Sequence, residues 1–295
     1  MKNLERADDR QSVRTVLKLI PLSMLLAGAC YGQNAQLQGA QLPVLVRDAL
    51  AAELRAAQDN THPMRYELRK SSPRLTTTKE IVETRDGGVA MLLTVNEQPP
   101  GDNDLRKDRS RLDDLLANPS KQKHRKHQED SDRARAFKVL QVLPSAFLYR
   151  DTGLIAAGSG HAERFVFVPN PAFNAPDMET AILTAMNGEI WIDPGKVRVV
   201  RLQAQLQRDV DFGWGVLGRL YKGGWITIDQ AQVADGVWRI VKFQMSMSAR
   251  VLFRTKDFQT TEYESHFEPV PPGLDYKQGI AMLRAMGTGA LVQGR

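Results

Sequence analysis

The sequence predicts an α+β fold built around one dominant, strongly curved antiparallel sheet. Alternations of apolar and polar residues recur along the chain and predict about nine strands. Most of these strands are joined by short turns, whereas a parallel crossover takes about a dozen residues or more. The clearest pair lies in residues 188–206, where Asp193-Pro194-Gly195 separates two strands. We therefore expect mostly antiparallel neighbours, with helices in the longer connections.

The first part of this fold is predicted to be one helix followed by three strands. Apolar side chains recur at helical spacing within residues 45–57. Residues 64–69 alternate between apolar and charged side chains, as in a half-buried strand. Residues 77–84 and 89–95 flank Asp86-Gly87-Gly88, and glycine supplies the positive backbone angle that a hairpin turn needs.

A charged helical insertion is expected at about residues 99–142. Strand patterns stop there, and lysine, arginine, histidine and acidic residues dominate much of the segment. Leucines at positions 105, 112, 115 and 116 give one helical face, and apolar residues within 134–142 give another. We predict two helices that bracket an exposed connection of mixed charge.

The later strands carry the candidate ligand-binding surface. Residues 197–206 alternate, and residues 225–233 and 238–253 are joined by Asp235-Gly236. The apolar face of these strands comprises Val200, Leu202, Leu206, Phe243, Met245, Met247, Val251 and Phe253. Methionine suits an adaptable apolar surface, but the same pattern is found in an ordinary core covered by helices. The pattern leaves both interpretations open.

The N-terminus has the pattern of a secretory signal. Basic residues precede an apolar run at positions 19–29, which ends in Ala27-Gly28-Ala29. The run is shorter than the roughly 20 apolar residues of a membrane-spanning helix. We expect residues 1–29 to be a signal peptide, although an uncleaved anchor is the alternative, and residues 30–41 to be a polar tether.

Cys30 is the only cysteine of the chain, so a disulfide within the chain is excluded. It follows Leu26-Ala27-Gly28-Ala29, which resembles the bacterial lipobox, where a cysteine receives a diacylglyceryl group. Ala27 stands where the lipobox usually has leucine. Cleavage after Ala29 without lipidation also fits the sequence. Lipidation of Cys30 would attach the mature protein to a membrane.

Motifs typical of catalysis are weak. Residues 213–218 fit the dinucleotide pattern G-x-G-x-x-G, but only six residues separate Gly218 from the strand expected at Trp225. That is too short for the helix of a βαβ unit, so we interpret the motif as a glycine-rich turn region. Ser159 and His161 could be a nucleophile and a base, but the neighbouring glycines favour a loop. We predict no catalytic residues and no cofactor.

The charged residues offer two further kinds of binding site, for a metal ion and for an anionic partner. His124 and His127 could share a helix face as metal ligands, but the lysines and arginines around them disfavour a cation, so no metal site is predicted. The net charge of +6 permits anionic partners without choosing among them. Acidic residues within the basic run and the export signal argue against nucleic acid as a partner.

The order of these elements resembles that of the outer-membrane lipoprotein-sorting proteins of the LolA and LolB type. The resemblance rests on strand order and on Gly188-Glu189-Ile190-Trp191-Ile192-Asp193, and covers residues 42–268 except most of the insertion. It implies an incomplete β-barrel lidded by helices, whose cavity holds acyl chains of lipids or lipoproteins. Residues 269–295 would then form a C-terminal tail with a short helix.

The resemblance implies a non-catalytic protein that is periplasmic, or anchored in the outer membrane and facing the periplasm. Its partners would be lipid or lipoprotein acyl chains, together with an envelope protein partner to which they are passed. Two alternatives stay open. An envelope sensor or scaffold could bind a protein partner through the same fold, and an enzyme acting on the envelope would need convergent ionisable side chains.

Overall fold

The computed structural model describes residues 42–158, 160–212, 218–251 and 253–292. The predictions for the signal segment and for Cys30 therefore lie outside the described residues. The elements in chain order are α2 (Val44–Gln58), β1 (Met64–Ser72), β2 (Leu75–Val82), β3 (Val89–Val95), α3 (Asp102–Ala117), α4 (Pro119–Ala146), β4 (Phe147–Ala157), β5 (Gly160–Pro169), α5 (Met178–Ala181), the 3-10 helix η1 (Ile182–Ala185), β6 (Met186–Asp193), β7 (Arg198–Leu206), β8 (Val210–Phe212), β9 (Gly218–Leu220), β10 (Trp225–Ala234), β11 (Val237–Val251), β12 (Arg254–Pro269) and α6 (Tyr276–Val292).

The described strands form one twelve-stranded sheet with the order β3-β2-β1-β12-β11-β10-β7-β6-β5-β4, and β9 joins β8 to β11. The sheet is antiparallel, and the strand order has two free ends, so the sheet is not closed. The predicted class, α+β with an incomplete antiparallel barrel and helices, is confirmed at this level.

The chain divides into two compact units, which are described separately. Unit 1 comprises the residues up to Arg55, Arg135–Ile228 and Gln244–Thr260, and unit 2 comprises Ala56–Ala134, Asp229–Phe243 and Thr261–Arg295.

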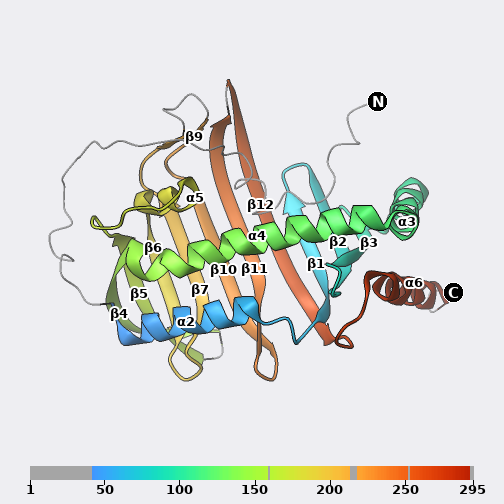
Figure 1. The fold of residues 1–295 in the computed structure, drawn as a ribbon, viewed down its shortest axis with the longest axis horizontal. Helices are drawn as coiled ribbons and strands as arrows, with labels where there is room; N and C mark the ends of the chain where they lie inside the picture. Colours follow the sequence, from blue (N-terminus) through green and yellow to red (C-terminus); the bar gives the residue numbers. More distant parts are fainter. Residues whose placement is uncertain (1–41, 159, 213–217, 252, 293–295) are drawn as a thin grey trace. The chain divides into compact units, whose positions relative to one another are not determined.

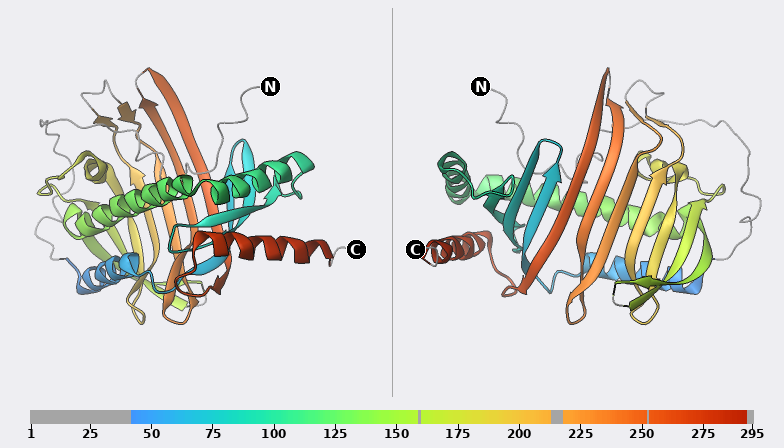
Figure 2. Two further views of the ribbon diagram at one scale, coloured as in Figure 1. Left: turned by 45° about the vertical axis from the view of Figure 1, so that its right-hand side comes forward. Right: turned by 180° about the vertical axis from the view of Figure 1, so that it is seen from behind.

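In unit 1, two helices lie across the same face of β4–β7. These are α2 and the part of α4 that follows Arg135 (Figures 1 and 2). An aromatic cluster fills the space beneath them, and the ring centroids of Phe147 and Phe167 are 4.5 Å apart. The buried Tyr149 hydroxyl donates a hydrogen bond of 3.0 Å to the carbonyl of Leu143 on α4, and burial raises the pKa of this phenol. Tyr149 thereby ties the end of α4 to the sheet.

The hairpin of β6 and β7 depends on a glycine at position 188. Gly188 pairs with Ala204, and the ring of Phe167 on β5 packs directly over it. The turn is wider than the tight Asp-Pro-Gly turn predicted from sequence. The Asp193 carboxylate accepts the N–H groups of Gly195 and Lys196, and Val197 has a positive φ of 53°. The side chain of Asp193 therefore organises a four-residue connection before β7 begins at Arg198.

Unit 2 has its own hydrophobic core, which joins β2 and β3 to α3 and α6. Its buried members are Val82, Val89, Leu112, Leu115, Val270, Tyr276, Ile280 and Leu283. Helix α3 also protects the outer edge of β3. Asp108 accepts the N–H of Leu92 at 3.0 Å, and Arg111 donates to the carbonyl of Ala90 at 2.6 Å. Side chains thus satisfy backbone groups that a bare edge strand would expose.

The β2–β3 turn of unit 2 is held from two sides. Gly87 adopts a φ of 94°, and the next N–H, that of Gly88, donates to the Glu129 carboxylate on α4 at 3.1 Å. The buried Gln122 side chain donates to the carbonyl of Asp86 at 2.8 Å. The Asp86 carboxylate in turn accepts the N–H of Tyr276, the first residue of α6. The turn is therefore the point at which α4 and α6 are attached to the strands.

The predicted mixed-charge connection between two helices is instead helical. The run of charged residues lies inside α4, which continues for 28 residues. Long straight-chain residues have good helix propensity, and the Lys126–Asp130 pair at 2.8 Å supports one face at i, i+4 spacing. Lys121 pairs with Asp114 of α3. Within the part of the chain that the structure describes, no helix is both long and apolar enough to cross a membrane.

Replacing Gly188 with alanine is expected to destabilise the protein strongly. A Cβ at this position would lie 2.0 Å from the Gln203 carbonyl oxygen and 2.6 Å from the Phe167 ring. Because both neighbours are packed in unit 1, we expect the free energy of unfolding in urea to fall by ~2 kcal/mol or more. Gly160→Ala is the control, since the nearest atom to its Cβ would be 3.9 Å away. Equal stability of the two variants would contradict the close packing at Gly188.

Candidate functional site

The apolar face beneath α2 and α4 in unit 1 is the candidate site, and we call it the covered face. Phe165, Ile190 and Ile192 contribute side chains that are at most 1% exposed. Phe165 and Ile190 are direct partners in the ladder between β5 and β6. From the helices, Val46 and Leu50 of α2 are buried as well. The described residues of this face are therefore closely packed.

A β-bulge at Val200 shapes the covered face. Ile192 pairs with Val199 and Trp191 with Arg201, so Val200 is the extra residue of β7. The bulge shifts the alternation by one position. Val199, which was not predicted to share this face, is only 4% exposed, while Val200 is half-buried. Beyond the bulge the predicted phase is confirmed.

Glu53 of α2 attaches the helix to this bulge. Its carboxylate accepts two hydrogen bonds from the Arg198 guanidinium, at 2.9 and 3.0 Å, and a third from the N–H of Val199 at 3.2 Å. Glu53 is only 8% exposed, so its charge is stabilised by these donors rather than by water. The ion pair satisfies a backbone donor beside the bulge and fixes α2 over β7.

Glu53 was not singled out from the sequence. The apolar spacing within residues 45–57 predicts a helix face made of apolar residues alone, but the buried residues of α2 are Val46, Ala49, Leu50 and Glu53. Glu53 lies seven residues after Val46 and three after Leu50, which is the spacing of one helix face. A carboxylate at such a position is the signal that could have indicated a buried ion pair.

The predicted ligand-binding residues divide into three groups. Leu206, Phe243, Met245 and Met247 are buried, while Val200, Leu202 and Val251 are half-buried and Phe253 is 96% exposed. Phe243 belongs to unit 2, and the other seven belong to unit 1. Phe253 lies at the end of the β11–β12 hairpin, away from any buried cluster.

Leu206 and Met247 are brought together at Gly224. A Cβ on Gly224 would lie 3.4 Å from Leu206 Cδ1 and 3.2 Å from Met247 Sδ, so both side chains occupy the space that the glycine leaves. Leu206 also exchanges backbone hydrogen bonds with this segment, at 2.8 Å to the carbonyl of Gly224 and 2.8 Å from the N–H of Gly223. A flexible methionine thus fills the gap over a glycine.

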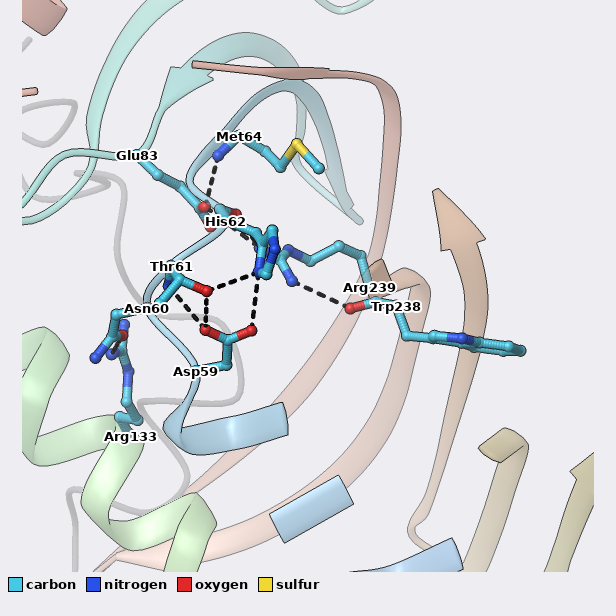
Figure 3. Close-up of polar contacts among 9 residues, drawn as sticks. All are labelled: Asp59, Asn60, Thr61, His62, Met64, Glu83, Arg133, Trp238 and Arg239. Carbon is cyan, nitrogen blue, oxygen red and sulfur yellow. Dashed lines mark hydrogen bonds and ion pairs between the residues drawn. The ribbon is translucent and has the colours of Figure 1, made fainter. Parts of the chain in front are cut away.

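A polar cluster precedes β1 in unit 2 (Figure 3). Asp59 accepts the Thr61 hydroxyl at 2.6 Å and the Thr61 N–H at 2.8 Å, and it contacts His62 Nδ1 at 2.9 Å. The hydrogen bonds from Thr61, followed by that from His62, lower the pKa of Asp59 to about 2. Arg239 donates to the His62 carbonyl at 2.7 Å. These side chains are mostly exposed, and the contacts order the turn that leads into β1.

The other candidates from the sequence are not assembled into a site. His124 contacts Gln128 on α4, and His127 is exposed. No group of three or more metal-ligating side chains is found among the residues described. His161 is an exposed residue of β5 that pairs with Ala156, while Ser159 lies outside the described residues. The G-x-G-x-x-G segment also lies outside them, except for Gly218 at the start of β9.

The geometry defines an α+β protein with an open antiparallel sheet and, in unit 1, a covered apolar face. No model of a protein family matches the chain, and no curated protein matches it. Among solved structures, one described as an outer membrane lipoprotein-sorting protein domain from Vibrio parahaemolyticus has 9% sequence identity to it. The match covers 78% of this chain and 94% of that chain, with a TM-score of 0.33. Similarity at this level assigns neither a family nor a function.

Glu53→Gln is expected to lower the free energy of unfolding by about 3 kcal/mol, because it leaves the Arg198 guanidinium without its charged partner in a largely buried position. Asp48→Asn on the same helix is the matched control. Its carboxylate pairs with Arg47 at the surface, and its loss should cost less than about 0.5 kcal/mol. Urea unfolding of both variants measures the difference, and similar values for the two would refute a structural role for the Glu53 ion pair.

Thr61→Ala is expected to raise the pKa of Asp59 from about 2 part of the way towards its ordinary value of 3.8, because one of the two Thr61 hydrogen bonds remains. Thr61→Ser keeps the hydroxyl and should leave the pKa low. The pKa of Asp59 is lower in the folded chain, so its stabilising contribution is present above pH ~4 and is lost as the pH falls towards ~2. Carboxyl NMR titration of the three proteins tests this, and an unchanged pKa in Thr61→Ala would contradict it.

Proposed function

We propose that this chain is an exported, non-catalytic envelope protein that binds acyl chains of a lipid or lipoprotein at the covered face. The observation that carries the proposal is the packing of two buried apolar side chains, Leu206 and Met247, against Gly224 of the sheet. A glycine and a methionine at the same point form a surface that can change shape without breaking backbone hydrogen bonds. An acyl chain could be accommodated there by displacing apolar side chains.

The mechanism is an exchange of apolar contacts. Val46 and Leu50 of α2 occupy the covered face in the ligand-free chain. When an acyl chain enters, it replaces part of that helix contact. Its transfer out of water contributes about 0.8 kcal/mol of binding free energy for each buried methylene. Because the displaced helix residues must then find other contacts, the net affinity stays moderate. Moderate affinity suits a carrier or receptor that must release its ligand.

In this mechanism the Glu53–Arg198 ion pair controls how far α2 can move. Its hydrogen bonds hold one side of the helix to β7, while the rest of the contact is apolar. The helix can therefore pivot about a fixed point instead of detaching. We infer that acyl chains enter between α2 and the strands while the ion pair is kept.

The N-terminal sequence supplies the cellular context of the proposal. The basic segment, the apolar run and Ala27-Gly28-Ala29 are typical of an export signal. Lipidation of Cys30 would make the protein a membrane-attached receptor, and cleavage without lipidation would make it a periplasmic carrier. Mass spectrometry of the mature N-terminus distinguishes the two forms.

Cis-parinaric acid, whose fluorescence rises in an apolar site, provides the binding assay for the exported mature chain. Gly224→Val should weaken its binding about tenfold, because the added side chain takes up the space shared by Leu206 and Met247. Gly160→Val, at an exposed strand position, should bind as the wild type does. Circular dichroism of each variant confirms that it is folded.

Native mass spectrometry of the wild-type chain, purified from the periplasm without detergent, gives a second result. We expect bound lipid or lipoprotein. If parinaric acid binding is saturable but Gly224→Val leaves it unchanged, the ligand does not bind at Leu206 and Met247. The absence of both parinaric acid binding and co-purified lipid would overturn the proposed function and favour a scaffold that binds only protein.

A further inference from the structure

The end of the β11–β12 hairpin has an unusual side chain for an exposed turn. Phe253 is 96% exposed, whereas the next most exposed large apolar residue among those described, Leu154, is 62% exposed. Exposed turns favour glycine, proline, asparagine, aspartate and serine, because those residues satisfy turn geometry and hydration. Leaving a phenylalanine ring in water forgoes the free energy of burying it. The ring is therefore a candidate anchor for a surface outside the chain.

The hairpin end projects beyond its neighbours in unit 1. β10 begins at Trp225, and the adjacent Gly224 lies against Ser246 and Met247 of β11, so β11 continues past the start of β10. Figures 1 and 2 show the β11–β12 end extending beyond β10 and β7. The short strand β9 pairs with Ala249–Val251 on one side of β11. The projection is thus held by backbone hydrogen bonds, so Phe253 is presented by an ordered strand pair.

Two basic residues follow this ring closely in sequence. Arg254 and Lys256 are exposed, and neither has an ion-pair partner among the described residues. Asp257 is the nearest acid in sequence, and it accepts a hydrogen bond of 2.6 Å from Ser248. Between Arg250 and Asp257 the chain has three basic residues and one acidic residue, a balance of 3 − 1 = +2. Phe253 is therefore flanked by positive charge.

The ladder between β9 and β11 places two further arginines near the base of this hairpin. Arg250 lies directly opposite Arg219, an arrangement that is unfavourable unless the charges are compensated. Arg219 is compensated by Asp211 at 2.6 Å and Asp209 at 3.4 Å, and hydrogen bonding to Asp211 raises the pKa of Arg219. Its charge is therefore largely offset at the base of the hairpin. Arg254 and Lys256 remain available at the end.

We propose that the β11–β12 end, defined as Phe253, Arg254 and Lys256, docks on the surface of an anionic phospholipid bilayer. Aromatic rings are favourable at the interface between headgroups and acyl chains, and lysine and arginine side chains are attracted to the negative surface of an anionic membrane. The combination of one exposed ring and two flanking cations matches that interface. The docking is reversible, because a single ring and two charges give a modest affinity.

This docking site is separate from the covered face. Leu206 and Met247 lie where β10 begins, and Phe253 lies beyond the end of β11. The inference goes beyond the proposed function and does not require it. Parinaric acid binding tests the covered face without vesicles, and the following experiment tests the hairpin end without an added acyl ligand. Either can fail while the other holds.

The first experiment places a fluorescent label at the hairpin end. Cys30 is the only cysteine, so Cys30→Ser removes both the single thiol and any N-terminal lipid from the exported chain. Phe253→Cys in this background gives one site for a polarity-sensitive fluorophore. Its emission should rise with vesicles of phosphatidylcholine and phosphatidylglycerol, and should stay constant with phosphatidylcholine alone. Leu154→Cys, labelled in the same way, is the control and should not respond.

The second experiment measures vesicle co-sedimentation of unlabelled variants in the Cys30→Ser background. Phe253→Ser should weaken binding to anionic vesicles at least about tenfold, since it removes the exposed ring that would enter the membrane interface. Arg254→Glu with Lys256→Glu should abolish the preference for phosphatidylglycerol, and salt should weaken wild-type binding. Leu154→Ser and Lys123→Glu, which alter exposed residues elsewhere, should bind normally.

Three results would overturn the inference. A label at position 253 that does not respond to anionic vesicles would show that the ring does not enter the membrane. Unchanged binding by Phe253→Ser would exclude the ring as an anchor. Binding that is equal on neutral and anionic vesicles and insensitive to salt would exclude the contribution of Arg254 and Lys256.

Discussion

The one-residue shift of register at Val200 determines how unit 1 is assembled. Because β7 has an extra residue there, Val199 faces the core and the N–H of Val199 is left for a side chain to satisfy. Glu53 accepts that N–H and the Arg198 guanidinium together. The bulge therefore fixes the position of α2 along β7, and the buried residues of α2 meet the sheet only in that position. A change that removed the bulge would displace these donors from a buried carboxylate.

Unit 2 depends on a different contact, the turn between β2 and β3. Gln122 and Glu129 of α4 and Tyr276 of α6 all bind its backbone or the Asp86 side chain. Helix α3 in addition covers the edge of β3. Helix α3 and the part of α4 up to Ala134 therefore belong to the structure of unit 2, since they satisfy strand and turn groups that would otherwise be exposed. Deleting these helical segments would therefore impair the folding of unit 2, and the loss of a binding partner could not be distinguished from misfolding.

Alternation along the chain predicted about nine of the twelve described strands, because a half-buried antiparallel strand imposes a period of two on its side chains, but it missed β4 and the short strands β8 and β9. It predicted the hairpins at Asp86-Gly87-Gly88 and Asp235-Gly236, and it placed Leu206 and Met247 on apolar faces that are buried. It could not predict the bulge at Val200, since a bulge is a relation between two strands. The burial of Glu53 depends on the same relation. The continuity of α4 was missed because charged residues predict exposure more directly than they predict conformation.

Apolar alternation indicates which face of a strand a residue occupies, while neighbouring elements decide whether that face is covered. Met247 and Phe253 were predicted together from one pattern in β11, yet one is 6% exposed and the other 96%. Met247 lies beside Gly224 and Leu206, at the start of β10. Phe253 lies past the last residue of β11, where β10 no longer accompanies the strand. Met247 therefore packs inside the protein, whereas the ring of Phe253 is left exposed to an external surface. This difference in exposure follows from where β10 and β11 begin and end.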